Sequence, residues 1–182
     1  MKKGWSILVP ISLSVFMIGC GSSSSSSPAS GIDINVSQSA LESAGWSVCH
    51  SELYGQSGTV ITDILSACSG ENLMLACRAV GESDFLVAAY APKTDVTYDT
   101  GIDYSTTHST GSVEWYYNDS YSWGFAKGGD DVYKNSCDIN STDAEYRMCL
   151  HTNSGNLSGG YRCGTVTNLN SSSDYERVFL TR

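Results

Sequence analysis

The chain has 182 residues, 41% of them hydrophobic, and carries 10 Lys and Arg against 19 Asp and Glu, so its formal net charge is −9. Long-range electrostatic attraction will not draw so acidic a chain to nucleic acid or to anionic lipid, and we expect no nucleic-acid partner. The length suits one domain with its own hydrophobic core.

The first 19 residues have the layout of a secretory signal peptide. Lys2 and Lys3 give a positive start, and residues 5–18 are apolar apart from three Ser and Pro10. A membrane-spanning helix, the alternative, needs about 20 apolar residues, and this stretch of 14 has Pro10 near its middle. We therefore expect residues 1–19 to direct export and then to be removed.

Residues 17–20, Met-Ile-Gly-Cys, resemble the lipobox of bacterial lipoproteins, which is typically Leu, a small residue, Gly or Ala, and Cys. The resemblance implies cleavage before Cys20 and attachment of diacylglycerol and, as a rule, of an N-acyl chain such as palmitate. Two or more acyl chains anchor a protein stably. In Gram-negative lipoproteins an Asp after the Cys favours the inner membrane. Gly21 stands there, so the resemblance implies the outer membrane, facing either the periplasm or the outside. A soluble secreted protein cut elsewhere is the alternative.

Residues 20–31 are then the lipidated Cys and a Ser-rich tether, and residues 32–182 form a single β-rich domain outside the cytoplasm. The tether cannot bury apolar surface, and as a flexible coil it spans roughly 20 Å. Without residues 1–19 the chain keeps 8 Lys and Arg against 19 Asp and Glu, a net charge of −11.

Six cysteines remain beyond Cys20. An even number in an exported chain favours disulfides, and the spacing matches no CxxC zinc pattern. The turn-rich segment before Cys149 favours its pairing with Cys137. The expected pairs are Cys137–Cys149, Cys49–Cys68 and Cys77–Cys163.

From residue 46 onward, short apolar or aromatic runs alternate with Gly, Asn, Asp and Ser, a pattern typical of strands joined by turns. Hairpin turns are expected at residues 81–84 and 118–120. The expected strands are 46–53, 73–80, 85–91, 96–98, 113–117, 121–126, 146–152, 161–166 and 175–181.

Residues 60–67 have helical spacing, with Thr59 or Thr62 able to cap the helix, and residues 37–43 allow a turn or two. The predicted fold is mostly β: a compact antiparallel sandwich or barrel with one short helix, stapled by up to three disulfides.

Four short runs resemble a Cys-containing domain of predicted secreted bacterial proteins. They are LMLACR at 73–78, YSWGFA at 121–126, GYRCG at 160–164 and YERV at 175–178. The resemblance covers about residue 46 to the C-terminus. That domain has no established activity, so the resemblance implies a single exported domain and no functional residue.

The densest aromatic stretch, residues 113–126, offers a candidate ligand surface. Alternate side chains of a strand share a face, so the odd-numbered aromatic residues form one row on each strand. An exposed aromatic row beside acceptors such as Glu114 suits a sugar ring. A hairpin that packs on both faces is the alternative. The candidate ligand-binding residues are Trp115, Tyr117, Asn118, Asp119, Tyr121 and Trp123.

An acidic stretch follows, beginning with Gly128 and Gly129. Calcium prefers about six to eight oxygen ligands, and a loop rich in Gly, Asn and Asp can wrap one. Residues 138–143 lack the Gly that an EF-hand loop needs at its sixth position, and solvated turns are the alternative. The candidate metal ligands are Asp130, Asp131, Asp138 and Asp143.

The chain contains no GxSxG, no HExxH and no Gly-rich phosphate loop, and His50, His108 and His151 belong to no catalytic motif. Cys163 is expected in a disulfide rather than as a nucleophile. The predicted function is therefore a non-catalytic glycan- or protein-binding module on a lipid-anchored envelope protein, with Ca²⁺ as the one candidate cofactor. A small envelope hydrolase and a purely structural envelope component are the alternatives.

Overall fold

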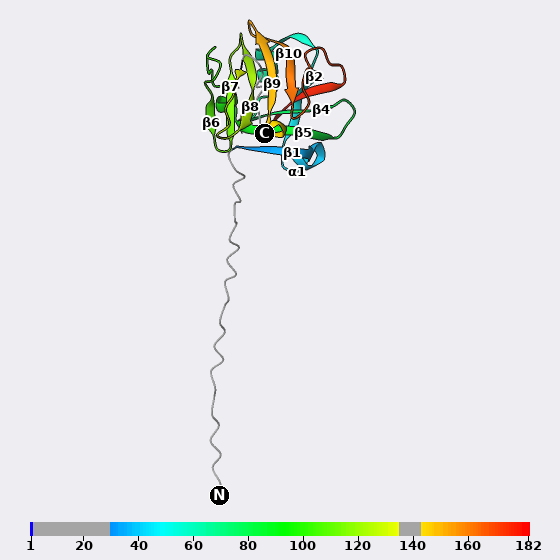
Figure 1. Cartoon of the computed structure of the whole chain (residues 1–182). Coiled ribbons are helices and arrows are strands. Elements are labelled where there is room, and N and C mark those ends of the chain that lie inside the picture. The colour runs from blue at the N-terminus through cyan, green and yellow to red at the C-terminus, as the bar shows by residue number, and fades with distance from the viewer. Residues whose placement is uncertain (2–29, 135–142) are drawn as a thin grey trace.

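Strands dominate this computed structural model, which describes Met1 and residues 30–134 and 143–182. They form two sheets in which every neighbouring pair is antiparallel (Figure 1). The strand orders are β1-β5-β4-β11-β2 and β3-β10-β9-β8-β7-β6. Among the described residues the two outer strands of a sheet do not pair with each other. The fold is therefore a sandwich of the predicted mostly β, antiparallel class and not a closed barrel.

The first sheet consists of β1 (Gly31–Ser37), β5 (Asp84–Pro92), β4 (Asn72–Ala79), β11 (Tyr175–Thr181) and β2 (Ser47–Leu53). The second consists of β3 (Ser57–Val60), β10 (Asn156–Cys163), β9 (Met148–Asn153), β8 (Ser122–Lys127), β7 (Val113–Tyr117) and β6 (His108–Thr110). The short helices are α1 (Gln38–Ser43), α2 (Ile61–Ala67), α3 (Lys93–Val96) and the 3₁₀ turn η2 (Ala144–Tyr146).

A hydrophobic core lies between the two sheets and takes side chains from both. Trp123 of β8 and Phe179 of β11 meet there, with ring centroids 5.3 Å apart. The Trp123 Nε1–H donates a hydrogen bond to the Val96 carbonyl at 3.0 Å, so the polar atom of this buried ring is satisfied. Aromatic packing thus holds the second sheet against the first.

The outer face of the first sheet is covered as well. Residues 73–77 of β4 are all fully buried, because alternate side chains enter the inner core and a second apolar layer. Leu41 of α1 and Trp46 belong to that second layer, and Ser37 caps α1 by accepting a hydrogen bond from the Ala40 N–H at 3.2 Å. A strand covered on both faces has the unbroken apolar sequence seen here.

Most expected strands are present, and 113–117 and 175–181 match β7 and β11 residue for residue. Residues 96–98 do not form a strand, because α3 continues to Val96, and the expected strand 161–166 begins earlier, as β10. The sequence analysis missed β1, β3 and β6, and all three are edge strands. An edge strand pairs on one side only and needs little apolar patterning.

The helix at residues 60–67 is present as α2, but the expected Thr cap is wrong. Val60 is the N-cap and makes no side-chain hydrogen bond. The Thr59 hydroxyl donates to the Glu52 carboxylate instead. With α1, α3 and η2 also formed, the domain has more than the one short helix expected.

Two disulfides lie within the described residues. Cys49–Cys68 ties β2 to the end of α2, and Cys77–Cys163 ties β4 to β10 across the sandwich. These are two of the three expected pairs. In the third, Cys137 lies outside the described residues, as do Cys20 and residues 21–29 of the tether.

After Met1 the description resumes at Ser30, whose Oγ donates to the Thr110 carbonyl in the second sheet at 2.9 Å. Strand β1 begins at Gly31, one residue before the expected start of the domain. Within residues 30–134 and 143–182, no helix has the length and apolar character needed to cross a membrane.

Candidate functional site

The aromatic hairpin expected to bind a ligand is formed by β7 and β8, paired with Trp115 opposite Phe125. The odd-numbered aromatic row faces the inner core: Trp115 is 1% exposed and Trp123 is not exposed at all. The prediction that Trp115 and Trp123 contact a ligand is therefore wrong. Burying large aromatic rings between two sheets stabilises the fold more than an exposed row would.

The other face of this hairpin is also covered. Tyr116 lies over Gly124, where a Cβ atom would come within 2.5 Å of the Tyr116 hydroxyl oxygen. The same hydroxyl donates to the Met148 carbonyl at 3.1 Å, and Val132 from the segment after β8 belongs to the same buried apolar cluster as Tyr116. The hairpin packs on both faces, which is the alternative considered above.

The remaining candidates, Tyr117, Asn118, Asp119 and Tyr121, lie at the turn of the hairpin. Tyr117 packs edge-on against Trp123. The Asn118 side-chain amide donates to Asp99 Oδ1 at 2.9 Å, which fixes the turn to the preceding loop. None of these four residues lines the cleft described next.

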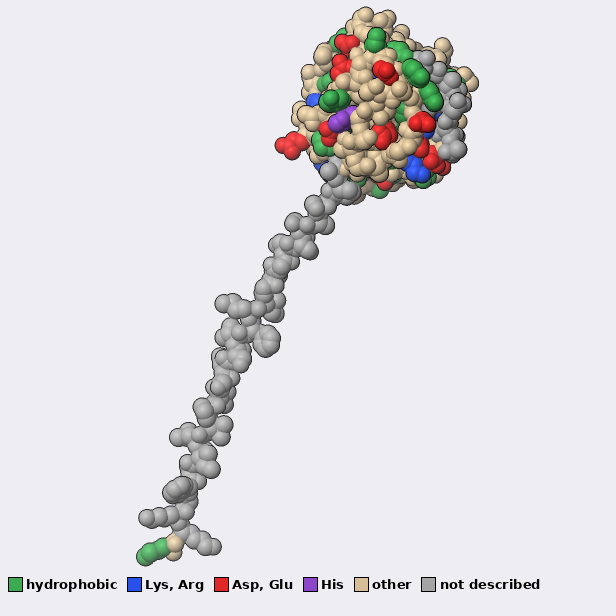
Figure 2. Space-filling model, turned by 60° about the vertical axis from the view of Figure 1, so that its left-hand side comes forward, with side chains coloured by type: hydrophobic (Ala, Val, Ile, Leu, Met, Phe, Trp, Pro, Cys, Tyr) green, Lys and Arg blue, Asp and Glu red, His purple; other side chains and the backbone are tan. Residues whose placement is uncertain are grey.

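A cleft of about 390 Å³ opens beside β6 and β7, at the edge of the second sheet. Acidic side chains are scattered over this side of the molecule, with few Lys or Arg among them (Figure 2). The volume of the cleft falls in the range of small-molecule sites, roughly 300–1,000 Å³. The cleft is lined by Tyr104, Ser105, Thr107, Ser109, Glu114, Gly129, Asp130, Asp131, Val132 and Tyr133.

Glu114 is the buried carboxylate of this cleft, with the residue only 8% exposed. It lies opposite Ser109 in the pairing of β6 with β7. Its Oε2 accepts hydrogen bonds from the Ser109 and Thr107 hydroxyls at 2.6 and 2.8 Å. Its Oε1 accepts one from the Gly129 N–H at 3.0 Å, an amide placed by the positive φ of that glycine, +84°.

Burial alone raises the pKa of the Glu114 carboxyl, but the hydrogen bonds from Ser109, Gly129 and Thr107 outweigh it. His108 nearby adds a smaller contribution in the same direction, and the net pKa is below its usual value. Glu114 is therefore ionised at neutral pH.

Two tyrosines stack against each other at the cleft. The Tyr104 and Tyr133 rings are nearly parallel, at 15°, with centroids 5.8 Å apart. Tyr104 is 51% exposed, so part of its ring is open to solvent. The residue after Tyr133, Lys134, joins the two segments that carry these tyrosines, because its backbone N–H donates to the Tyr104 carbonyl at 2.8 Å.

The Lys134 side chain is buried and binds the loop that carries Tyr104. Its Nζ donates to the Thr100 carbonyl, the Thr100 hydroxyl and the Gly101 carbonyl, each at 3.2 Å. Burial lowers the pKa of this lysine, while Asp103 and Asp99 act in the opposite direction. One lysine thus positions the tyrosine pair from beneath.

The acidic stretch does not form the expected calcium site among the described residues, where no group of three or more candidate ligands comes together. Asp130 pairs with Arg147 Nη2 at 2.8 Å, and Asp143 pairs with Lys127 Nζ at 3.2 Å. Asp131 supplies its backbone carbonyl to Arg147 Nη1 at 2.9 Å, and Asp138 lies outside the described residues. Two of the expected ligands are neutralised by cations of the protein itself.

The histidines form no catalytic arrangement with one another. His108 Nε2 lies 3.0 Å from Asp95 Oδ1, and its ring stacks on Tyr98 with centroids 4.3 Å apart. His50 Nε2 lies 3.5 Å from Glu52 Oε2. Neither His50 nor His108 meets a Ser or Thr hydroxyl in the described part of the chain, and Cys163 is bonded to Cys77, as expected.

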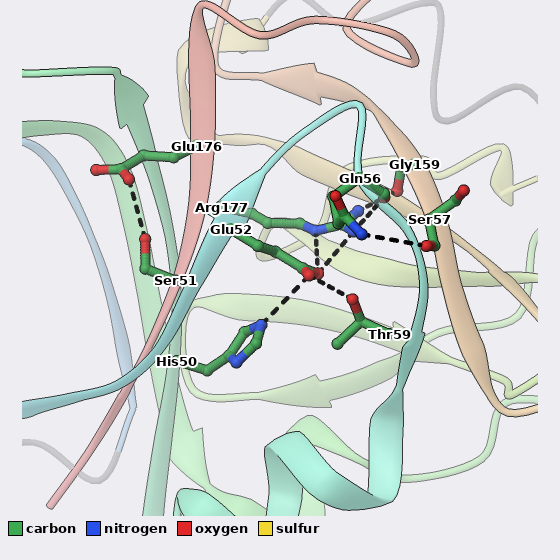
Figure 3. A network of polar contacts seen from close by, with 9 residues as sticks. All are labelled: His50, Ser51, Glu52, Gln56, Ser57, Thr59, Gly159, Glu176 and Arg177. Carbon is green, nitrogen blue, oxygen red and sulfur yellow. Dashed lines mark hydrogen bonds and ion pairs between the residues drawn. The ribbon is translucent and has the colours of Figure 1, made fainter.

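A second polar cluster surrounds Arg177, which is fully buried (Figure 3). Its Nε donates to Glu52 Oε1 at 2.8 Å, and its Nη1 and Nη2 donate to the Gly159 and Gln56 carbonyls at 2.5 and 2.7 Å. The second Glu52 oxygen accepts from Thr59. Because both carboxylate oxygens and the guanidinium are occupied by the protein, we interpret this cluster as structural.

Glycoside hydrolysis needs a base or nucleophile together with a carboxylic acid of raised pKa. Of the carboxyl groups in the cleft, Glu114 has a lowered pKa, and Asp130 is paired with Arg147. Glu114 is therefore not the carboxylic acid of raised pKa that such a reaction needs.

The structure joins two segments that the sequence suggested separately: Glu114 from the aromatic hairpin and Asp130 and Asp131 from the acidic stretch line one cleft. Sequence reasoning missed Tyr104 and Tyr133, which belong to irregular segments 29 positions apart and share no periodic pattern. No protein-family model, no curated protein and no solved structure matches this chain.

Proposed function

We propose that this protein is a lipoprotein of the cell envelope, anchored in the outer membrane through Cys20, and that its domain binds a glycan without catalysis in the cleft beside Tyr104 and Tyr133. The cleft is the observation that supports the glycan. It gathers a stacked tyrosine pair, three hydroxyl side chains and an ionised carboxylate around one volume of about 390 Å³.

A sugar ring presents apolar C–H faces and a rim of hydroxyl groups. The exposed part of Tyr104 offers a flat apolar surface to such a face. The Ser105, Thr107 and Ser109 hydroxyls donate to Asp103 and Glu114, which leaves their oxygens to accept from the sugar, and Glu114 keeps one acceptor position. The lining therefore offers an aromatic surface to the apolar face of a sugar and hydrogen-bond acceptors to its hydroxyl groups.

The cleft is also preformed, which favours binding because little side-chain entropy remains to be lost. Lys134 holds the Tyr104 loop by four hydrogen bonds, and Arg147, only 3% exposed, holds Asp130 and the Asp131 carbonyl. Tyr104 and Asp130 are thus each fixed by a buried cation.

The membrane anchor is supported by the lipobox resemblance at residues 17–20 and by the Ser-rich tether that follows. The domain begins at Ser30 beside the β6–β7 turn, so the tether leads directly to the folded sandwich.

A glycan array probed with the full-length protein in mild detergent tests the binding. We expect retention on a restricted set of oligosaccharides and no turnover of the bound sugar. Retention on no glycan, together with specific capture of an envelope protein, would show that the partner is a protein. Release of reducing ends from the bound sugar would show a hydrolase.

A further inference from the structure

Among the described residues, the carboxylate of Glu114 forms no ion pair with a Lys or Arg, and only His108 contributes charge nearby. No Lys, Arg or His of the described chain lines the cleft. Residues 135–142, which follow Tyr133 and Lys134, contain no Lys, Arg or His in their sequence and cannot supply one. The adjacent His108 is engaged by Asp95.

Covering an ionised carboxylate with a neutral ligand is costly, because the group loses water and gains no opposite charge. A carboxylate has about four acceptor positions. Three of them are filled by Thr107, Ser109 and Gly129, so one remains on Oε1. An ammonium group offers both the missing hydrogen bond and the missing charge.

From these contacts we infer that the ligand of the cleft is a sugar bearing a free amine, such as a glucosamine oligosaccharide, rather than its neutral N-acetylated form or an acidic glycan. This rests on the proposed function. Asp131 at the exposed rim adds negative charge, and the faces of Tyr104 and Tyr133 attract a cation through their π systems. An amine-bearing sugar thus satisfies the charge, the acceptor and the aromatic surface together.

Titration calorimetry on the full-length protein in mild detergent, at pH 6, compares three trisaccharides of matched length: β-1,4-linked glucosamine, its fully N-acetylated form and galacturonic acid. We expect the amine form to bind about tenfold or more tightly than the acetylated form, and the acidic form not to bind. Raising the salt concentration is expected to weaken only the binding of the amine form.

Glu114→Gln is expected to reduce amine binding about tenfold and to abolish the preference for the amine form over the acetylated form. Asp131→Asn, at the rim, gives a second variant that removes charge without touching a buried group, and Asp119→Asn, outside the cleft, is the matched control. Equal binding of the amine and acetylated forms, or tighter binding of the latter, overturns the inference and leaves glycan binding intact. Binding of no trisaccharide overturns both.

Discussion

Arg177 of β11, which is fully buried, forms an ion pair with Glu52 of β2, whose side chain is 10% exposed, with the guanidinium Nε 2.8 Å from Oε1. The two residues are opposite each other in the first sheet. The same guanidinium reaches the Gly159 carbonyl on β10 of the second sheet, so one side chain connects both layers (Figure 3). The Nε, Nη1 and Nη2 atoms of this arginine each donate to an oxygen of the protein, and a buried charge requires such partners.

Replacing Arg177 by Met is expected to destabilise the domain by about 3–5 kcal/mol, because Glu52 is left as a buried charge without its partner. The measurement is the free energy of unfolding by guanidinium chloride, with disulfides intact. The exposed pair Lys127–Asp143 gives the control: Lys127→Ala is expected to change the unfolding midpoint very little. Equal unfolding midpoints for the two variants would show that the Arg177–Glu52 pair contributes no more to stability than an exposed pair.

Sequence reasoning predicts the central strands well because they carry the apolar pattern of the core. Residues 73–77 of β4 and 177–180 of β11 are buried inside the first sheet, and both segments were expected in strands. The edge strands β3 and β6 were missed because they are short, mostly polar and paired on one side only, whereas β1 was missed although Ile32, Ile34 and Val36 alternate along it. The apolar pattern of a segment reflects how much of it is buried, and an edge strand is buried less than a central one.

The candidate site was harder to predict from the sequence than the strands, because it depends on which distant segments come together in the fold. Residues 113–126 are dense in aromatics, and the sequence does not show whether a partner sheet covers them. The structure covers Trp115 and Trp123 and leaves Tyr104 half exposed in a loop with no regular period. The contact between Tyr104 and Tyr133 arises from the buried position of Lys134, which no local pattern predicts.

Loss of the Cys77–Cys163 disulfide is expected to destabilise the domain more than loss of Cys49–Cys68. The chain-entropy model gives roughly 4.6 kcal/mol for a sequence separation of 86 and roughly 3 kcal/mol for one of 19. Urea unfolding of the two double Cys→Ala variants measures the difference. A larger loss for the Cys49–Cys68 variant would mean that local structure around α2 outweighs loop closure.

The lowered pKa of Glu114 predicts a pH dependence of stability. Its folded pKa lies below the usual 4.5, so the unfolded chain binds the proton first as the pH falls. The stabilisation is complete at neutral pH and is lost as the pH falls below about 4.5 through the folded value. Glu114→Gln is expected to be less stable than the wild type at pH 7 by about 1–2 kcal/mol, because an amide nitrogen cannot accept the hydrogen bonds made to the oxygen that it replaces.

That difference is expected to shrink as the pH is lowered to 3, where Glu114 itself becomes protonated. Unfolding free energies of both proteins at pH 7, 5, 4 and 3 give the comparison. Exposed Asp131→Asn controls for general charge effects. A difference that stays constant down to pH 3 would contradict the assignment of Glu114 as an ionised, hydrogen-bonded carboxylate.

Cys20→Ser is expected to release the protein from the membrane while leaving the domain folded. The sandwich begins at Gly31 and makes no use of Cys20 in its described contacts. Membrane fractionation and mass spectrometry of the mature N-terminus measure the effect. Wild-type protein recovered wholly in the culture medium, or with an unmodified Cys20 thiol, would refute the anchor.

Tyr104→Ala is expected to weaken glycan binding about tenfold, because the sugar loses the aromatic surface at the cleft, worth about 1–1.5 kcal/mol. Tyr98→Ala is the matched control: its side chain is similarly exposed, at 54% against 51%, and it does not line the cleft. Because Tyr104 lies in a loop held mainly by backbone and Lys134 contacts, its truncation should leave the unfolding midpoint close to that of the wild type. Equal losses of binding for the two variants would place the ligand across the whole exposed loop, and a loss for Tyr98→Ala alone would place it beside His108, away from Glu114.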